Sequence, residues 1–181
     1  VDVSKWWDSG NTGANTAGEN NPTSPEESVV VKGKAAKLQS TWIGFIGIGA
    51  FASASMFTGN FVDIDGTNGI LSFGQPFTAK PTKLTGYYKY TPVNIDYMEQ
   101  WDSKVDPDLK SGDSDQCIIY IALCTKNYEI RTNPKSRQLF DPNDASVIAY
   151  GELVAKEAVS GEEANGYKKF PIDIKYRKTD V

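Results

Sequence analysis

Apolar and polar residues alternate along several short segments of the chain, and residues that favour turns separate these segments. The clearest case is Lys168–Tyr176, in which every second residue is apolar or aromatic. Because successive side chains of a β-strand point to opposite faces, this pattern predicts a strand with one face in the core. Pro171 faces away from the apolar set, which suits an edge strand. The apolar set is Phe170, Ile172, Ile174 and Tyr176.

Similar patterns predict a chain built almost entirely from short strands. Gln116–Thr125 is apolar at nearly every position, so we expect a central strand that is covered on both faces. Glu152–Val159 could form a helical turn or two, and residues 1–28 are mostly loop by composition. About eight strands separated by turns predict an all-β, two-sheet β-sandwich, with residues 1–181 as a single domain. The other expected strands are Ser28–Lys32, Ala35–Trp42, Phe57–Ile64, Ile70–Phe73, Thr82–Tyr90 and Ser146–Leu153.

The strand predicted at Thr82–Tyr90 has one core face and one solvent face. Leu84 marks the core face, so Tyr87 and Lys89, which are two residues apart, project outward together. Gly86 inside this strand indicates a bulge or a close approach of another part of the chain. The outward pair is therefore a candidate for a ligand-binding surface.

Residues 38–62 carry no charged side chain. A transmembrane helix needs about 20 mostly apolar residues, but glycine and serine interrupt this stretch repeatedly. We expect buried strand and loop here, and no transmembrane span.

The charge balance and the absence of histidine exclude several functions. The chain has 23 acidic and 19 basic residues, and this net charge of −4 argues against a nucleic-acid partner. It contains no histidine, which removes Ser-His-Asp and Cys-His catalysis and the commonest metal ligand. We expect no cofactor and no metal site.

The two cysteines are predicted to be unpaired. Cys117 and Cys124 lie seven residues apart on the same predicted strand, so their side chains point to opposite faces about 23 Å apart. A disulfide requires Cα atoms within about 7 Å. Both cysteines are therefore expected to be small buried side chains.

Aromatic residues are abundant, at 12% of the chain. Most aromatic side chains pack in cores, but exposed ones can also stack on the apolar face of a sugar ring. Trp6 and Trp101 lie in polar loop segments, where core burial explains a tryptophan less readily; anchoring of the loop is the alternative. The candidate carbohydrate-binding residues are Tyr87, Lys89, Trp101 and Trp6.

A carboxylate cluster keeps an enzymatic alternative open. A glycoside hydrolase needs two carboxylates about 5 to 10 Å apart, one of them with a raised pKa. The same acids could hold Ca²⁺, although their spacing matches no EF-hand loop. A solvated turn explains them equally well, so we assign no catalytic residue. The cluster is Glu99, Asp102, Asp113 and Asp115.

The segment "FGQPFTAKPTKLTGYYKY", from Phe73 to Tyr90, resembles a motif of the putative carbohydrate metabolism domain family. "WWDSGNTGAN", "AAKLQS" with "MFTGNF", and "VIAYGEL" with "FPIDIKYR" are also similar to the family pattern. The family occurs in surface lipoproteins of Gram-negative bacteria that degrade polysaccharides. The resemblance implies a jelly-roll sandwich like that of carbohydrate-binding modules, an extracytoplasmic location at the outer-membrane surface or in the periplasm, and a chain trimmed at both ends relative to the family domain. It implies no particular catalytic residue.

These observations together favour a non-catalytic module that binds a polysaccharide or oligosaccharide in bacterial carbohydrate use. The first alternative is a glycoside hydrolase or lyase on the same fold, which the carboxylate cluster would serve. The second alternative is a structural or adhesive surface domain. No residue pattern excludes either alternative, so both require an experiment.

Overall fold

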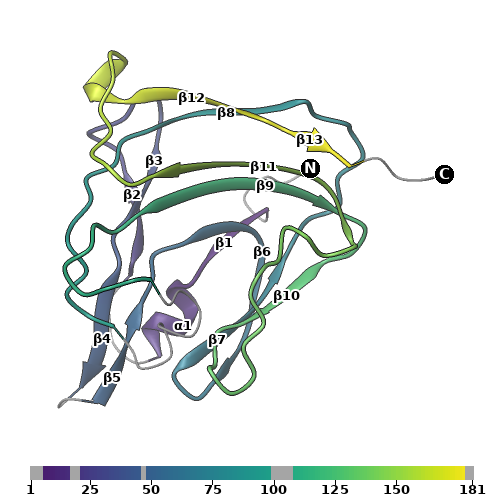
Figure 1. Ribbon diagram of the computed structural model, residues 1–181. Coiled ribbons are helices and arrows are strands. Elements are labelled where there is room, and N and C mark those ends of the chain that lie inside the picture. Colours follow the sequence, from purple (N-terminus) through teal and green to yellow (C-terminus); the bar gives the residue numbers. More distant parts are fainter. Residues whose placement is uncertain (1–5, 17–20, 46–47, 99–107, 178–181) are drawn as a thin grey trace. The chain divides into compact units, whose positions relative to one another are not determined.

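The computed structural model describes residues 6–16, 21–45, 48–98 and 108–177, and it is nearly all β (Figure 1). Strands make up 47% and helices 5% of the structure, and the strands pair in antiparallel sheets. The predicted all-β class is confirmed, and the antiparallel sheets agree with a β-sandwich. The jelly-roll connectivity stays a prediction.

In the described part of the chain, the strands follow one another with two short helical turns between them. They are β1 (Trp7–Ser9), β2 (Thr23–Glu26), β3 (Ala35–Leu38), β4 (Thr41–Phe45), β5 (Ile48–Ala52), β6 (Met56–Asp65), β7 (Asn68–Phe73), β8 (Lys83–Tyr88), β9 (Cys117–Cys124), β10 (Tyr128–Arg131), β11 (Val147–Ala155), β12 (Lys168–Asp173) and β13 (Lys175–Tyr176). The helical turns are α1 (Asn11–Asn15) and η2 (Ala164–Gly166).

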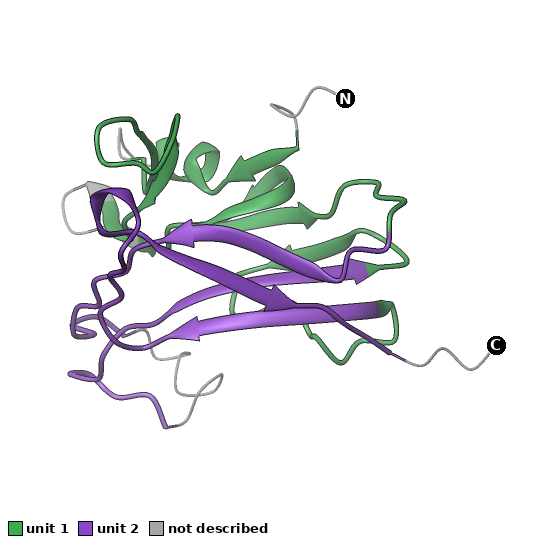
Figure 2. Cartoon of the chain, turned by 90° about the horizontal axis from the view of Figure 1, so that it is seen from above, with its two compact units in different colours: residues 1–79, 124–147 green, residues 80–123, 148–181 purple. Residues whose placement is uncertain are grey.

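The chain divides into two compact units (Figure 2). Unit 1 comprises residues 1–79 and 124–147, and unit 2 comprises residues 80–123 and 148–181. That residues 1–181 form one domain stays a prediction.

Unit 1 contains a four-stranded sheet in the order β1-β6-β7-β10 and two separate two-stranded ribbons, β2-β3 and β4-β5. The long β6–β7 hairpin closes through Asp65–Asn68, where Gly66 adopts a positive φ of 69° that suits glycine. The rings of Phe57 and Phe73 lie 4.6 Å apart between their centroids on this hairpin. At Gly59 the strands approach so closely that a Cβ atom would overlap the Ser72 carbonyl oxygen.

Unit 2 contains the sheet β13-β11-β9 and the ribbon β12-β8. Phe170, Ile172 and Ile174 are buried, as their alternation predicted, whereas Tyr176 is exposed. Gly151 on β11 lies against the Asp173 carbonyl and the Ile172 side chain, where a Cβ atom would not fit. The buried side of β12 therefore packs closely in this unit.

The strand predicted at Ser28–Lys32 is wrong. The Glu26 carboxylate accepts hydrogen bonds from the Ser28 and Val29 backbone N–H groups, at 2.8 and 3.0 Å, and from the Ser28 hydroxyl at 2.7 Å. These bonds lower the pKa of Glu26 to about 2 and bend the chain directly after β2. The apolar run Val29–Val31 is therefore part of a turn, and the chain pairs through β2 and β3 on either side of it.

The predicted N-terminal loop contains three regular elements that its composition does not reveal. β1, α1 and β2 all fall within residues 1–28. The strand predicted at Ala35–Trp42 is also divided, because β3 ends at Leu38 and β4 begins at Thr41.

The Gln116–Thr125 segment forms a strand, β9, but the prediction of a central strand covered on both faces is wrong. β9 stands at one end of its sheet order, next to β11. Ile118 and Tyr120 are 49% and 36% exposed. No disulfide joins Cys117 to Cys124, as predicted, although both side chains are half-buried and not fully buried.

The helical turn considered at Glu152–Val159 does not form, because β11 continues to Ala155. The uncharged stretch 38–62 forms β4, β5 and much of β6. Within the described ranges, no helix has the length and apolar character needed to cross a membrane.

Candidate functional site

The outer face of the β8–β12 ribbon includes Tyr87, one of the residues predicted to bind carbohydrate. The antiparallel register places Tyr87 opposite Lys169, Thr85 opposite Pro171, and Lys83 opposite Asp173. Opposed residues of an antiparallel pair share a face, and all six of these side chains are exposed. We call these six residues the ribbon face.

The other side of the ribbon is packed, which holds the ribbon face in place. Leu84 and Tyr88 on β8 lie on the same side as Phe170 and Ile172 on β12. Gly86 leaves room for the Phe170 ring, since a Cβ atom there would lie 2.8 Å from two ring carbons. The Phe170 ring also meets the Tyr88 ring edge-on at 5.6 Å. The close approach predicted at Gly86 is therefore present.

Lys89 lies directly after β8 and two residues from Tyr87, so it extends the outward face of the strand. The adjacent turn restrains its side chain. Its Nζ donates a hydrogen bond to the Asn165 carbonyl at 2.8 Å and lies 5.7 Å from the centre of the Tyr167 ring. Asn165 has a φ of 58°, a left-handed conformation that asparagine tolerates. An ammonium group has three N–H donors, so Lys89 can hold this turn and still donate to a ligand.

Trp6 is explained by packing in unit 1. The edge of its ring meets Phe77 at a centroid distance of 6.5 Å and an interplanar angle of 81°. Its carbonyl accepts a hydrogen bond from the Gly59 N–H at 3.1 Å. These contacts support the alternative that Trp6 anchors its loop. Trp101 lies outside the described residues, so of the four predicted residues the structure brings together Tyr87 and Lys89.

Sequence reasoning missed an aromatic pair on the neighbouring strands of unit 2. The rings of Tyr120 on β9 and Tyr150 on β11 lie 6.0 Å apart, and the Tyr150 hydroxyl donates to the Glu152 carboxylate at 2.8 Å. Burial raises the pKa of Tyr150, and the bond to Glu152 raises it further. The sequence of β9 does not show that Ile118 and Tyr120 are exposed. Nearly every position of that strand is apolar, so no polar residues mark its exposed face.

The strand register places this pair on the same side of unit 2 as the ribbon face. Tyr150 is opposite Lys175 of β13. Lys175 is two residues from Asp173, and Asp173 is opposite Lys83. Because alternate residues of extended chain share a side, Tyr150 and Lys175 continue the ribbon face. Two aromatic positions, Tyr87 and the Tyr120–Tyr150 pair, therefore lie along one side of this unit.

Two acids of the carboxylate cluster, Asp113 and Asp115, lie among the described residues. Asp113 accepts a hydrogen bond from the Lys110 backbone N–H at 2.8 Å, which closes a turn. Asp115 lies near Tyr90 and Cys117, and its charge contributes to the raised pKa of both groups after burial, the larger cause. Glu99 and Asp102 lie outside the described residues. In the described part of the chain, no three acidic or cysteine side chains gather as a metal site.

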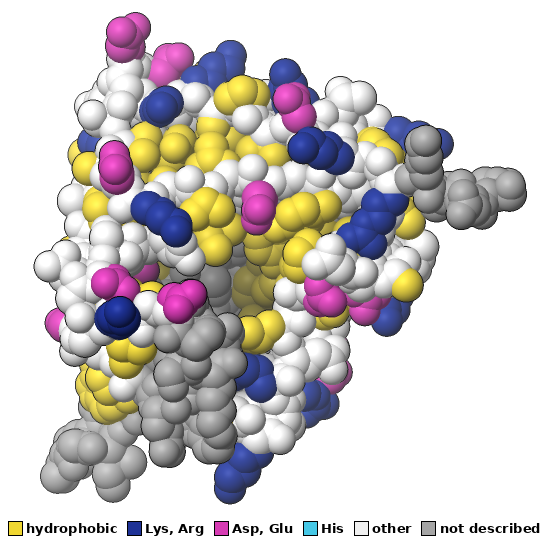
Figure 3. Space-filling view, viewed as in Figure 1, with side chains coloured by type: hydrophobic (Ala, Val, Ile, Leu, Met, Phe, Trp, Pro, Cys, Tyr) yellow, Lys and Arg dark blue, Asp and Glu magenta, His cyan; other side chains and the backbone are white. Residues whose placement is uncertain are grey.

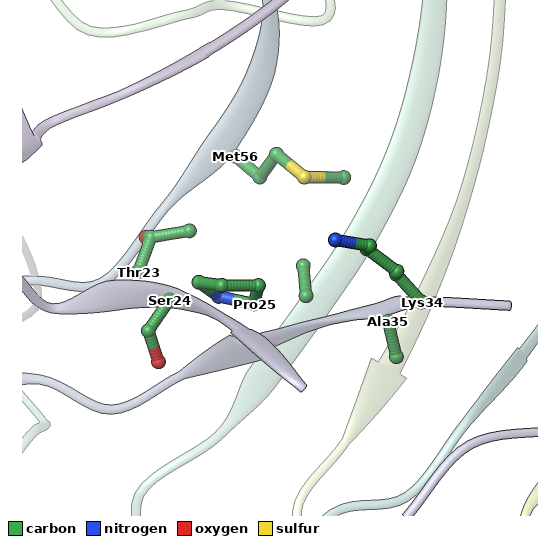
Figure 4. A pocket seen from close by; sticks show the side chains of 7 residues that line it. Thr23, Ser24, Pro25, Lys34, Ala35 and Met56 are labelled. Atoms are coloured by element: carbon green, nitrogen blue, oxygen red, sulfur yellow. The ribbon is translucent and has the colours of Figure 1, made fainter. Parts of the chain in front are cut away.

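Unit 1 contains an open recess of about 420 Å³ between the β2–β3 ribbon and Met56 of β6 (Figure 4). Its lining is mostly aliphatic, and the Lys34 ammonium at its rim pairs with Glu27. A second recess, of about 180 Å³, has a polar lining. Neither lining includes an aromatic side chain on which a sugar ring could stack. The first is lined by Thr23, Ser24, Pro25, Lys34, Ala35, Ala36 and Met56, and the second by Asn21, Pro22, Ser24, Lys37, Gln39 and Thr41.

The model of the family described as the putative carbohydrate metabolism domain matches residues 1–181. The chain belongs to this family. The resemblance seen in Phe73–Tyr90 is thereby confirmed over the whole chain. No curated protein and no solved structure gives a significant match. The family description connects the chain with carbohydrate metabolism.

Proposed function

We propose that the chain is a non-catalytic module that binds a polysaccharide or oligosaccharide on the ribbon face. The observation that carries the proposal is Tyr87, which is 44% exposed on a ribbon whose opposite side is packed. Its strand is therefore held in place, and its ring is accessible. The family description supplies the connection with carbohydrates.

The groups around Tyr87 suit a polar ligand that also has apolar faces. A sugar ring presents C–H groups on its flat side and hydroxyl groups around its rim. Tyr87 offers the ring for stacking, while Lys169, opposite, and Lys89, two residues on, offer N–H donors. Sites of this kind, formed by one stacking surface and a few hydrogen bonds, give micromolar to millimolar dissociation constants, or roughly −4 to −8 kcal/mol.

The proposal includes an extracytoplasmic location, at the outer-membrane surface as a lipoprotein or in the periplasm. The family resemblance supports this part. The enzymatic alternative has less support, because the Asp113 carboxylate is bound to a turn N–H group. The alternative of a structural or adhesive domain has no particular residue in its favour.

Affinity electrophoresis against a broad polysaccharide panel, followed by titration calorimetry, tests the proposal. We expect Tyr87→Ala to weaken binding about fivefold, which corresponds to the loss of about 1 kcal/mol of aromatic contact. Trp42→Ala is the matched control, because Trp42 is also 44% exposed but lies in unit 1. It should leave the affinity unchanged.

Three outcomes would contradict the proposal. Release of reducing sugar from a bound polymer would show that the chain is an enzyme. Equal losses in Tyr87→Ala and Trp42→Ala would show that the ribbon face is not the site. Absence of binding to every polymer in the panel, with a folded protein, would favour the structural or adhesive alternative.

A further inference from the structure

Basic residues are concentrated in the two chain segments that form the β8–β12 ribbon and its continuation. Residues 80–90 and 168–177 together hold seven basic side chains and one acid, Asp173. The other 160 residues hold twelve basic and twenty-two acidic side chains. The ribbon is thus strongly cationic in a chain whose net charge is −4. The seven are Lys80, Lys83, Lys89, Lys168, Lys169, Lys175 and Arg177.

Strand pairing brings these seven charges together, although about 80 residues separate the two segments in the sequence. β8 and β12 pair over six residues on each strand, from Lys168 opposite Tyr88 to Asp173 opposite Lys83. All seven basic side chains are exposed. Figure 3 shows dark-blue lysine and arginine side chains along β8 and β12, with hydrophobic side chains between them.

The single acid of the two segments, Asp173, pairs with Lys83. Asp173 lies 3.3 Å from the Lys83 ammonium, and both side chains are largely exposed. Lys89 bonds to a neutral carbonyl, so its charge is not compensated there. Among the salt bridges of the described residues, the Lys83 pair is the one that involves a basic residue of the ribbon. Lys169 lies opposite the exposed ring of Tyr87, so a cation and a stacking surface stand side by side.

We propose that the ligand of the ribbon face is an acidic polysaccharide, whose sugar units carry carboxylate or sulfate groups. This inference rests on the proposed function and adds the chemical class of the glycan. Charge complementarity supports it, because a local positive field attracts a polyanion even when the whole protein is acidic. The net charge argued against nucleic acid, which is also a polyanion, but it is a sum over the whole chain and not over the ribbon. The charge close to the ligand determines whether a polyanion is attracted, because salt screens charges more than about 8 Å away at physiological ionic strength.

The test compares polymers that differ in charge alone. Polygalacturonate is compared with its methyl-esterified form, and dextran sulfate with dextran, by titration at 50, 150 and 300 mM NaCl. We expect at least one acidic polymer to bind about tenfold or more tightly than its neutral counterpart at 50 mM, with affinity falling as salt rises.

The residues are tested with a pair of double variants that remove the same charge. Lys169→Gln with Lys175→Gln should weaken binding to the acidic polymer about tenfold or more, because each lysine near an anionic surface contributes on the order of 1 kcal/mol. Lys126→Gln with Lys135→Gln removes two exposed lysines of unit 1 and should have little effect. Thermal unfolding of both variants confirms that each is folded.

The outcomes separate this inference from the proposed function. Binding to the neutral polymers that equals or exceeds binding to the acidic ones, and that is lost in Tyr87→Ala, overturns the acidic class and leaves glycan binding intact. Equal losses in the two double variants also overturn it. Absence of binding to all four polymers, and to the wider panel, overturns both. Single-stranded DNA or phosphatidylserine vesicles that bind more tightly than either acidic polymer would identify a different polyanion and overturn the inference.

Discussion

Two ribbons of this molecule have the same architecture and opposite surface chemistry. β4–β5 and β8–β12 are each antiparallel and two-stranded, and each presents an aromatic residue that is 44% exposed, Trp42 and Tyr87 respectively. Opposite Trp42 stands Phe51, which is 43% exposed. Opposite Tyr87 stands Lys169. No residue from Thr41 to Ala52 is charged, whereas the β8–β12 ribbon and its continuation hold seven basic side chains.

The comparison shows that an exposed aromatic residue does not by itself indicate a carbohydrate site. A sugar needs hydrogen-bond donors beside the stacking surface, because its hydroxyl groups lose water on binding. The side chains that face each other at Trp42 and Phe51 are both aromatic, and the one polar group that they offer is the Trp42 indole N–H. Tyr87 has cationic donors beside it. The ribbon face is therefore the better candidate for a carbohydrate site.

The largest effect is expected from the buried isoleucine of each ribbon. Ile43 on β4 and Ile172 on β12 are both 3% exposed. Ile43→Ala and Ile172→Ala should each lower the free energy of unfolding by about 2–5 kcal/mol, through lost burial and the cavity left behind. Urea denaturation followed by circular dichroism measures the loss. A loss below about 1 kcal/mol for Ile43→Ala alone would show that the apolar hairpin contributes little to the core.

The next largest effect concerns the close approach at Gly86. A Cβ atom there would lie 2.8 Å from the buried Phe170 ring, so Gly86→Ala should cost about 1–3 kcal/mol of unfolding free energy. Gly69→Ala on β7 is the control, because its Cβ would make ordinary contacts at 3.5 Å or more. It should change stability by less than about 1 kcal/mol. Equal losses in the two variants would show that the Phe170 contact does not set the cost.

A smaller effect on stability is expected at alkaline pH, where Tyr90, which follows β8, titrates. The β4–β5 ribbon has no ionisable side chain. Burial raises the pKa of Tyr90 from 10.0 to about 12, and the Asp115 charge contributes. Between these values the unfolded chain releases the proton while the folded chain keeps it, so unfolding becomes easier as pH rises. Below pH 10 both states hold the proton and the contribution is constant.

Urea denaturation at pH 8 and pH 11 measures this effect. The wild-type chain should lose about 1 kcal/mol through Tyr90 over this interval, and Tyr90→Phe should be less sensitive to pH by that amount. Identical pH dependence in the wild type and in Tyr90→Phe would contradict the assignment to Tyr90.

The smallest effect on stability is expected at the salt bridge between Lys83 and Asp173. Both side chains are exposed, so Asp173→Asn should change the unfolding free energy by less than about 1 kcal/mol. It removes the one acid of the ribbon, and binding to an acidic polymer should strengthen by up to about fivefold. Glu129→Gln, which breaks the exposed pair with Arg131 in unit 1, should leave binding unchanged. Weaker binding after Asp173→Asn would contradict a cationic site.

Strands with one apolar face could be predicted from the sequence, and their partners could not. The alternation at Phe170, Ile172 and Ile174 identified buried positions because burial of apolar surface sets that period. The same pattern carries no information on which strand lies alongside, so the pairing of β12 with β8 appears only in the fold. At Ser28–Lys32 three hydrogen bonds to one carboxylate outweighed a run of valines that favours strand.

The candidate site was predictable to a similar extent. The outward direction of Tyr87 and Lys89 followed from their spacing around Leu84. The turn at Asn165 that restrains Lys89, and the Tyr120–Tyr150 pair, involve contacts between distant segments that no local pattern contains. The concentration of positive charge on the ribbon could not be predicted from the sequence, because each segment alone holds only three or four basic residues.

The tight approach at Gly59 has a consequence for how related sequences should be read. With a φ of 138° and the Ser72 carbonyl where a Cβ would lie, this position admits glycine alone. It falls within "MFTGNF", one of the segments similar to the family pattern. In a library of random variants we expect every survivor to keep this glycine, whatever ligand is used for selection. An invariant residue here records a demand of the backbone, and it carries no information about the ligand.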